Sequence, residues 1–145
     1  MKILIINGIN LHNIGSREPQ IYGNENFDDY FQNLKSKFNF EIDYFQSNYE
    51  SKIVEKIIFA SNSEFNGIVL NAGAFSHTSV AIRDAISATE IPVVLIHISN
   101  TYKREIFRQQ ELIAPVCKGI ITGFGLKSYE LGIMSLMNEK LTANK

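Results

Sequence analysis

Residues 2–6, KILII, and residues 7–23, NGINLHNIGSREPQIYG, decide how the rest of the chain is interpreted. The apolar run closed by Asn-Gly predicts a buried strand that ends in a turn. A segment of about fifteen residues then follows, rich in Asn, Gly and ionisable side chains. It is too long for an ordinary connection, and we therefore expect a functional loop.

This loop contains an arginine and a tyrosine five residues apart, Arg17 and Tyr22. A guanidinium held beside a phenol favours the phenolate, so a tyrosine with an ordinary pKa of about 10 can serve as a base near neutral pH. The alternative is that Arg17 pairs with Glu18 in solvent while Tyr22 packs on the surface. The two residues alone do not decide between these interpretations.

Composition limits the class of protein. The chain has 145 residues, 45% of them hydrophobic and 20% charged, which predicts a single domain spanning residues 1–145. A net charge of −1 gives no electrostatic footprint for nucleic acid or an acidic membrane, so small molecules or other proteins are the expected partners. Cys117 is the one cysteine, and neither a signal peptide nor a membrane-spanning run is found. We expect a soluble cytoplasmic protein.

Five apolar runs alternate with helical patterns, which predicts βαβ units and a parallel sheet with right-handed crossovers. The strands are nearly continuous in apolar residues, as expected for a sheet covered on both faces. The predicted fold is an α/β, flavodoxin-like three-layer sandwich. The expected strands are 2–6, 40–45, 68–70, 93–98 and 119–122, and the expected helices are 26–38, 50–61, one beginning near 78, a short segment after 99, and 126–141.

Ligands of open α/β sheets bind outside the carboxyl ends of the strands, so the residues that follow each strand are the informative ones. They are unusually polar in this chain. Their side chains and free backbone N–H groups predict a pocket for a small carboxylated, hydroxylated ligand. These residues are Asn7, Asn10, Asn71, His77, His97, Ile98, Ser99, Asn100 and the run 123–125.

Some candidates have two interpretations. His97 could be a satisfied core histidine, but its position at the ligand edge of the sheet favours the site. His77 and Asp84 would share a helix face if the helix began before His77, although Asp84 fits solvent equally well. Arg104 and Arg108 present two cations on one face, for solubility or for capture of substrate oxygens.

Metal and nucleotide sites are mostly excluded by spacing. No Cys, His, Asp and Glu residues are arranged as metal ligands, and the glycines at 123 and 125 lack the third glycine of a dinucleotide fingerprint. We expect no metal and no cofactor. A phosphoacceptor receiver domain needs acidic residues where this chain has Asn7 and Asn71. An unrelated flavodoxin-like domain that binds flavin stays a distant alternative.

Three blocks resemble one family, the type II 3-dehydroquinate dehydratases. Residues 7–23 resemble the signature NGPNLNxLGxREPxxYG, residues 71–85 (NAGAFSHTSVAIRDA) a second block, and residues 96–108 (IHISNTYKREIFR) a third, in register from Met1 to about Met137. The resemblance implies the flavodoxin-like fold and a cofactor-free conversion of 3-dehydroquinate to 3-dehydroshikimate in the shikimate or quinate pathways. It also implies a dodecamer built as a tetramer of trimers.

The resemblance implies a role for each matching residue. Tyr22 would remove a proton from C2 of the substrate, with Arg17 keeping it ionised. Asn10 would hold the enolate through a water, and His97 would protonate the departing C1 hydroxyl. The expected binding residues are Asn71 with the backbone N–H groups of Ile98 and Ser99 for the carboxylate, His77 and Arg108 for the ring hydroxyls, Asp84 for a neighbouring subunit's site, and Arg104 for the closing loop.

Three departures from the family pattern stand out. Leu95 replaces the usual glutamate two residues before the catalytic histidine. Residues i and i+2 of a strand share a face, so that glutamate could orient the imidazole and favour its charged form, whereas leucine cannot. Ile9 replaces a proline, and Lys127 and Ser128 stand near the usual Pro and Gly. Leu95 motivates an alternative, a degenerate homologue that binds a cyclitol carboxylate or acts as an assembly module with little catalysis.

Overall fold

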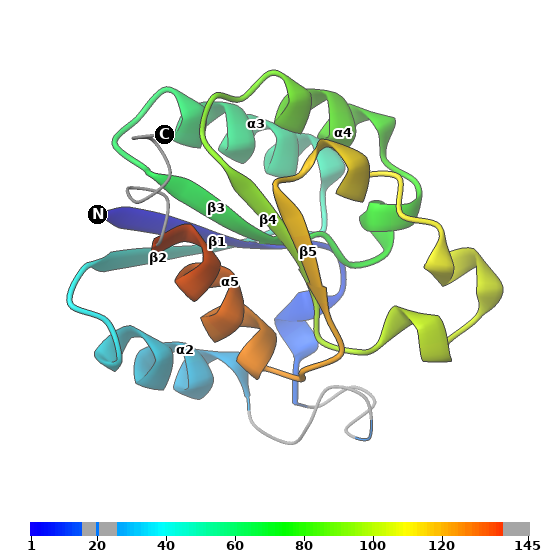
Figure 1. The fold of residues 1–145 in the computed structure, drawn as a ribbon, viewed down its shortest axis with the longest axis horizontal. Coiled ribbons are helices and arrows are strands. Elements are labelled where there is room, and N and C mark those ends of the chain that lie inside the picture. The colour runs from blue at the N-terminus through cyan, green and yellow to red at the C-terminus, as the bar shows by residue number, and fades with distance from the viewer. Residues whose placement is uncertain (16–19, 21–25, 138–145) are drawn as a thin grey trace, which may run out of the picture.

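The computed structural model describes residues 1–15, 20 and 26–137. Its strands form one sheet in the order β2-β1-β3-β4-β5, and every neighbouring pair is parallel (Figure 1). The strand order reverses between β1 and β3, which is the topological switch point of a flavodoxin-like sheet. The predicted fold class is confirmed. The strands are β1 (Lys2–Asn7), β2 (Glu41–Gln46), β3 (Gly67–Asn71), β4 (Val93–His97) and β5 (Gly119–Thr122).

Helices cover both faces of the sheet and complete the three layers (Figure 1). On one face lie α2 (Phe27–Ser36) and α5 (Lys127–Met137), and on the other lie α3 (Glu50–Ser61) and α4 (Val80–Ser87). Each face has its own apolar cluster, because the side chains of a strand alternate between the two faces. Ile3 and Ile5 of β1 belong to the first cluster, and Leu4 and Ile6 to the second.

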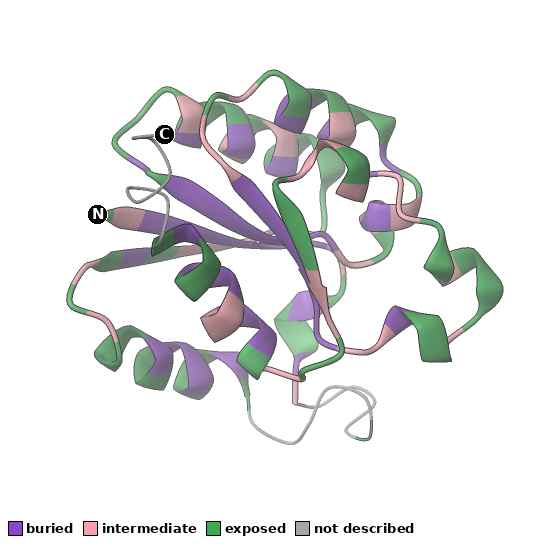
Figure 2. Ribbon diagram, viewed as in Figure 1, coloured by how far each residue is buried: buried purple, intermediate pink, exposed green. Residues whose placement is uncertain are grey.

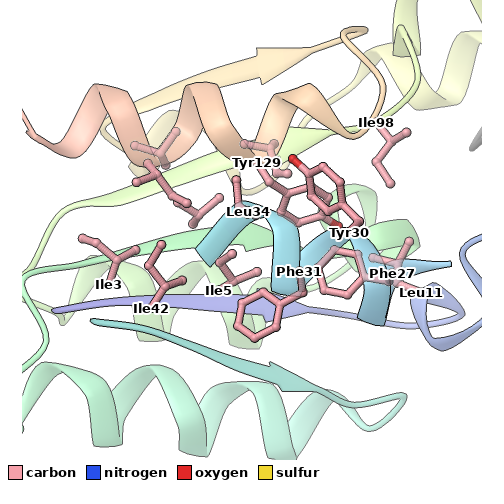
Figure 3. Packing of buried hydrophobic residues seen from close by; sticks show 14 of the residues in the cluster. Ile3, Ile5, Leu11, Phe27, Tyr30, Phe31, Leu34, Ile42, Ile98 and Tyr129 are labelled. Atoms are coloured by element: carbon pink, nitrogen blue, oxygen red, sulfur yellow. The ribbon is translucent and has the colours of Figure 1, made fainter. Parts of the chain in front are cut away.

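The central strands are the most deeply buried part of the molecule. All residues of β3 and β4 are buried, whereas β5 at the edge is exposed or half-buried (Figure 2). The cluster under α2 and α5 is rich in aromatic rings (Figure 3). Phe27 lies 4.7 Å from Tyr44 and 5.0 Å from Tyr129 between ring centroids, so three elements are packed together through one side chain.

Capping residues fix where two helices begin. Asn26 accepts a hydrogen bond from the backbone N–H of Asp29, so α2 begins at Phe27. Ser79 accepts one from the N–H of Ile82, so α4 begins at Val80. The helix therefore does not begin before His77, and the condition under which His77 and Asp84 would share a helix face is not met. His77 instead ends a 3₁₀ turn, η2 (Gly73–His77).

The remaining connections are built from short 3₁₀ turns. The polar segment expected to form a short helix after Ser99 forms two separate turns instead, η3 and η4. None of the helices within residues 1–15, 20 and 26–137 has the length and apolar character needed to cross a bilayer. The turns are η1 (Leu11–Asn13), η3 (Thr101–Lys103), η4 (Ile106–Gln109) and η5 (Ala114–Val116).

Candidate active site

A pocket opens at the carboxyl ends of β1, β3 and β4, where the strand order reverses. It encloses about 680 Å³, part of which is open to solvent. The segments that follow these three strands meet there, and they supply both charged and uncharged hydrogen-bonding side chains. The lining residues are Ile9, Asn10, Leu11, Asn71, Gly73, Ala74, His77, His97, Ile98, Ser99, Thr101, Arg104 and Arg108.

Four polar side chains form a hydrogen-bonded row beneath the pocket. The buried hydroxyl of Tyr129 donates to Asn7 Oδ1 at 2.8 Å and accepts from Asn71 Nδ2 at 3.0 Å. Asn7 Nδ2 in turn donates to the hydroxyl of Tyr44 at 3.4 Å. Burial raises the pKa of Tyr129 far above its ordinary value, and it raises that of Tyr44 to about 12. Both phenols therefore stay neutral, and the row fixes which way the Asn71 amide faces.

His97 ends β4 and lies beside a carboxylate that the sequence analysis did not identify. Nε2 of His97 is 2.9 Å from Oε1 of Glu111, and the two side chains are only 7% and 10% exposed. The distance is that of an ion pair, but the ring N–H is not aligned with it, and Oε1 accepts no well-formed hydrogen bond. The other oxygen of Glu111 accepts a bond from the buried hydroxyl of Ser76 at 2.5 Å.

The environment of Glu111 acts on its protonation in two directions. Burial raises the pKa of this carboxyl, but the neighbouring His97, Ser76 and His77 together outweigh burial and hold it below its ordinary value. Glu111 is therefore ionised at neutral pH, next to the imidazole of His97.

Hydrogen bonds to the backbone of residues 110–112 bring Glu111 into this position. The N–H of Leu112 donates to the carbonyl of Ser76 at 3.0 Å, and the guanidinium of Arg83 donates to the carbonyl of Leu112 at 2.6 Å. Nδ1 of His77 donates to the carbonyl of Gln110 at 2.8 Å. These three contacts hold residues 110–112 against η2 and the start of α4.

The same contacts define the state of His77. Because Nδ1 carries the proton donated to the Gln110 carbonyl, Nε2 is the nitrogen left for a ligand. The His77 ring is stacked on that of His97, with 5.8 Å between centroids and 9° between planes. The two imidazoles, predicted from separate elements, are thus brought together in one pocket.

Two arginines are among the residues that line the pocket. Arg104 and Arg108 both line it, which favours ligand contact over a purely solubilising role. Glu105 contacts both, at 2.8 Å from Nε of Arg108 and 3.8 Å from Nε of Arg104. The guanidinium of Arg108 also lies over the ring of Phe107. These contacts hold two cations where a carboxylated or hydroxylated ligand would enter.

Asn10 enters the pocket on an unusual backbone. Its φ of 65° lies in the left-handed region, which asparagine tolerates better than most residues. Its N–H donates to the side-chain oxygen of Asn48 at 2.9 Å. Gln46 bonds both Gly8 and Asn48, so the loop after β1 is tied to the end of β2.

The predicted residues divide into three groups. Asn10, Asn71, His77, His97, Ile98, Ser99 and Arg108 all line this pocket, as does Arg104. Asp84 is exposed on α4 and does not line it. Arg17 and Tyr22 lie outside the described residues.

Sequence analysis missed Glu111 and Ser76. The missing glutamate at position 95 was the only signal that a carboxylate had to come from elsewhere, and no spacing pointed to Glu111. In the described part of the chain, no group of three or more His, Cys, Asp or Glu side chains is arranged to hold a metal ion.

Comparisons with known proteins agree with this geometry. The family model for class II dehydroquinase matches residues 1–137. The chain belongs to the class II dehydroquinase family. A 3-dehydroquinate dehydratase of Campylobacter lari is 47% identical over 139 residues, covering 94% of this chain and 86% of that relative. One from Nitratiruptor is also 47% identical over 139 residues, with 94% and 88% covered.

Solved structures of the same family superpose on the whole fold. The crystal structure of type II dehydroquinase from Butyrivibrio crossotus matches with a TM-score of 0.89 and 46% identity, covering 94% of this chain and 97% of that one. The type II dehydroquinase from Propionibacterium acnes matches with a TM-score of 0.90 and 35% identity, covering 95% and 97%. This class II dehydroquinase thus shares both sequence and architecture with its relatives over nearly its full length.

Proposed function

We propose that this chain converts 3-dehydroquinate to 3-dehydroshikimate without a cofactor, in the shikimate or quinate pathway. The observation that carries the proposal is the convergence of Asn10, Asn71, His77, His97 and Arg108 in one pocket at the carboxyl ends of the strands. Family membership supports the same reaction, because relatives named 3-dehydroquinate dehydratase match over 94% of this chain.

The first step is removal of a proton from C2 of the substrate. The phenolate of Tyr22 takes this proton, and Arg17 keeps the phenol ionised. The electron pair of the C–H bond moves to the C3 carbonyl oxygen and gives an enolate. A water held by Asn10 donates a hydrogen bond to the enolate oxygen, which stabilises charge that develops only during the reaction.

The second step expels the C1 hydroxyl as water. The enolate collapses, the C1–C2 double bond forms and the C1–O bond breaks, while His97 gives its proton to the leaving oxygen. Asn71 and the backbone N–H groups of Ile98 and Ser99 hold the carboxylate on C1. His77 offers Nε2, and Arg108 its guanidinium, to the ring hydroxyls.

A second candidate is a homologue that binds such a ligand without useful catalysis. Leu95 favours it, because the strand position that would support His97 is apolar. The carboxylate of Glu111, 2.9 Å from Nε2 of His97, favours the active enzyme instead. Binding seen by calorimetry without turnover would select the inactive homologue.

The test is a spectrophotometric assay of turnover of 3-dehydroquinate, which compares the unaltered chain with the variant Tyr22→Phe. Turnover raises the ultraviolet absorbance, since the product has a double bond conjugated with its carbonyl. We expect Tyr22→Phe to lower kcat by roughly 10²–10⁴-fold, the contribution typical of a general base. Tyr49→Phe removes the hydroxyl of a tyrosine that is 73% exposed and outside the pocket, and it should retain full activity. No turnover by the unaltered chain at high enzyme concentration ends the proposal.

The proposal extends to assembly. We propose a dodecamer, a tetramer of trimers, in which Asp84 reaches the site of a neighbouring subunit. The exposed position of Asp84, away from the pocket of its own chain, is compatible with that role. A cytoplasmic location and a single domain over residues 1–145 also stay predictions.

A further inference from the structure

The carboxylate of Glu111 is buried beside His97, although no motif requires it there. Its side chain is 10% exposed, and its buried Oε1 lies 2.9 Å from Nε2 of His97 without a well-formed hydrogen bond. Burying a carboxylate is costly unless charge or hydrogen bonds compensate it. Ser76 compensates one oxygen, and the charged form of the His97 imidazole is the natural partner of the other.

The position of Leu95 explains why this carboxylate matters. Leu95 is fully buried in the apolar cluster beneath α3 and α4, which also contains Ile113, two residues after Glu111. His97 lies two residues along the same strand and shares the face of Leu95. Glu111 therefore approaches His97 on the face where a glutamate at position 95 would stand.

We propose that Glu111 is the positioning residue for His97, and that it supplies from the loop before β5 the negative charge that position 95 lacks. The inference rests on the proposed function. One ring nitrogen of His97 faces Glu111, and the other is left for the substrate. During dehydration His97 gives its proton to the leaving hydroxyl and becomes neutral, while Glu111 stays ionised throughout.

The other titratable groups around His97 cannot take this role. His77, stacked on it from η2, is neutral or cationic. Among the described residues that line the pocket, the permanently charged ones are Arg104 and Arg108, which disfavour an imidazolium. Burial raises the pKa of the nearby Cys117 thiol to about 12, so it carries no charge at neutral pH. Glu111 opposes these cations.

The first experiment compares Glu111→Gln with the unaltered enzyme. Glutamine keeps the shape and removes the charge. We expect kcat to fall about 10- to 100-fold, a part of the roughly 10²–10⁴-fold that a general acid supplies. KM should change less than about 3-fold, because Glu111 does not line the pocket and acts on the substrate only through His97. The basic limb of the pH–rate profile should move down by about one pH unit.

A matched control separates this effect from the loss of any ion pair. Glu130 on α5 pairs with Lys37 at 2.8 Å, and its side chain is 24% exposed and outside the pocket. Glu130→Gln should leave kcat and the pH profile unchanged. A merely structural role for Glu111 would lower the melting temperature of Glu111→Gln without moving its pH–rate profile.

Moving the carboxylate gives a second, independent test. Leu95→Glu alone should not raise kcat, because it sets a second anion beside Glu111. In the double variant Leu95→Glu, Glu111→Gln, the glutamate at position 95 should raise kcat at least 5-fold above that of Glu111→Gln. The basic limb of the pH–rate profile should also return toward its position in the unaltered enzyme. A large gain from Leu95→Glu alone would contradict the proposal, since it would mean that His97 lacks a carboxylate partner.

NMR spectra of the imidazole nitrogens distinguish failure of this inference from failure of the proposed function. The chain has three histidines, so His97 is assigned by one variant, His97→Asn. We expect Glu111→Gln to change the ¹⁵N chemical shift of the His97 Nε2 atom, which lies 2.9 Å from Glu111, and to leave the signals of exposed His12 unchanged. If the unaltered enzyme turns over and Glu111→Gln changes neither the His97 signals nor kcat, the role of Glu111 alone is overturned. If the His97 signals change but the unaltered chain shows no turnover, the proposed reaction is overturned and the pairing of Glu111 with His97 is kept.

Discussion

At the scale of single residues, the active site is held by buried side chains that do not themselves line the pocket. Tyr129 is fully buried and joins Asn7 to Asn71 through one hydroxyl. An amide can face either way, and the hydroxyl determines that Asn71 directs Nδ2 toward Tyr129. The orientation of a ligand-binding asparagine thus depends on a residue from α5, 58 positions along the chain.

We therefore predict that Tyr129→Phe weakens both stability and substrate binding. Phenylalanine leaves the buried Asn7 oxygen without its donor, which should cost about 1–3 kcal/mol of unfolding free energy. KM should rise more than kcat falls, because the Asn71 amide loses its fixed orientation. Urea unfolding and steady-state kinetics measure the two effects. Tyr49→Phe, at an exposed tyrosine, is the control. We expect it to change the unfolding free energy by no more than about 0.5 kcal/mol.

At the scale of elements, the pocket depends on how closely the ends of β1 and β3 approach. The N–H of Gly8 donates to the carbonyl of Asn71 at 2.7 Å. A Cβ at Gly8 would lie 2.3 Å from the carbonyl oxygen of Ala72, a backbone atom that cannot turn aside. Only glycine allows the strand ends to meet here, and this contact places Asn10 and Asn71 in one pocket.

Gly8→Ala should accordingly destabilise the fold and impair the site together. We expect overpacking to lower the free energy of unfolding by about 1–3 kcal/mol or more. KM should rise, because the loop that contains Asn10 is pushed away from Asn71. Gly119→Ala is the matched control, because a Cβ there meets nothing within 4 Å. Thermal melts of the two variants compare them directly. Equal melting temperatures would mean that the strand ends can move apart at little cost.

At the scale of the whole molecule, the question is whether one chain contains a complete site. The pocket gathers residues from the loop after β1, from β3 and β4 with the segments that follow them, and from the η3–η4 segment, but Asp84 lies exposed on α4. If Asp84 completes a neighbour's site, activity depends on assembly. Light scattering should then give a mass about twelve times the 16.4 kDa of one chain.

Mixed assemblies provide the sharper prediction. Tyr22→Phe disables its own site, and Asp84→Ala would disable the neighbour's. Assemblies co-expressed from both variants should contain some sites with an intact Tyr22 and an intact neighbouring Asp84, so their activity should exceed that of either variant alone. Activity equal to the average of the two separate variants would show that Asp84 serves no neighbouring site.

Much of the fold was predictable because its signals are local. Apolar runs bounded by Asn-Gly or Pro predict the strands, and the Asn26 and Ser79 caps mark two helix starts within a residue or two. The start of α4 at Val80 determined that His77 and Asp84 do not share a helix face. His77 lies in a 3₁₀ turn that faces the pocket, whereas Asp84 lies on the helix and faces solvent. Periodicity alone could not distinguish these, because a helix begun three residues earlier fits the same letters.

The sequence by itself determined the parallel sheet, its ligand edge and the polar residues that follow β1, β3 and β4, since each of these depends on neighbours a few positions apart. Only the tertiary structure decided which carboxylate supports His97. Glu111 is 14 positions from that histidine and reaches it because residues 110–112 bond to η2 and Arg83. Contacts between segments far apart in the chain leave no spacing pattern, so a charge missing at position 95 and supplied at 111 becomes visible only once the chain has folded.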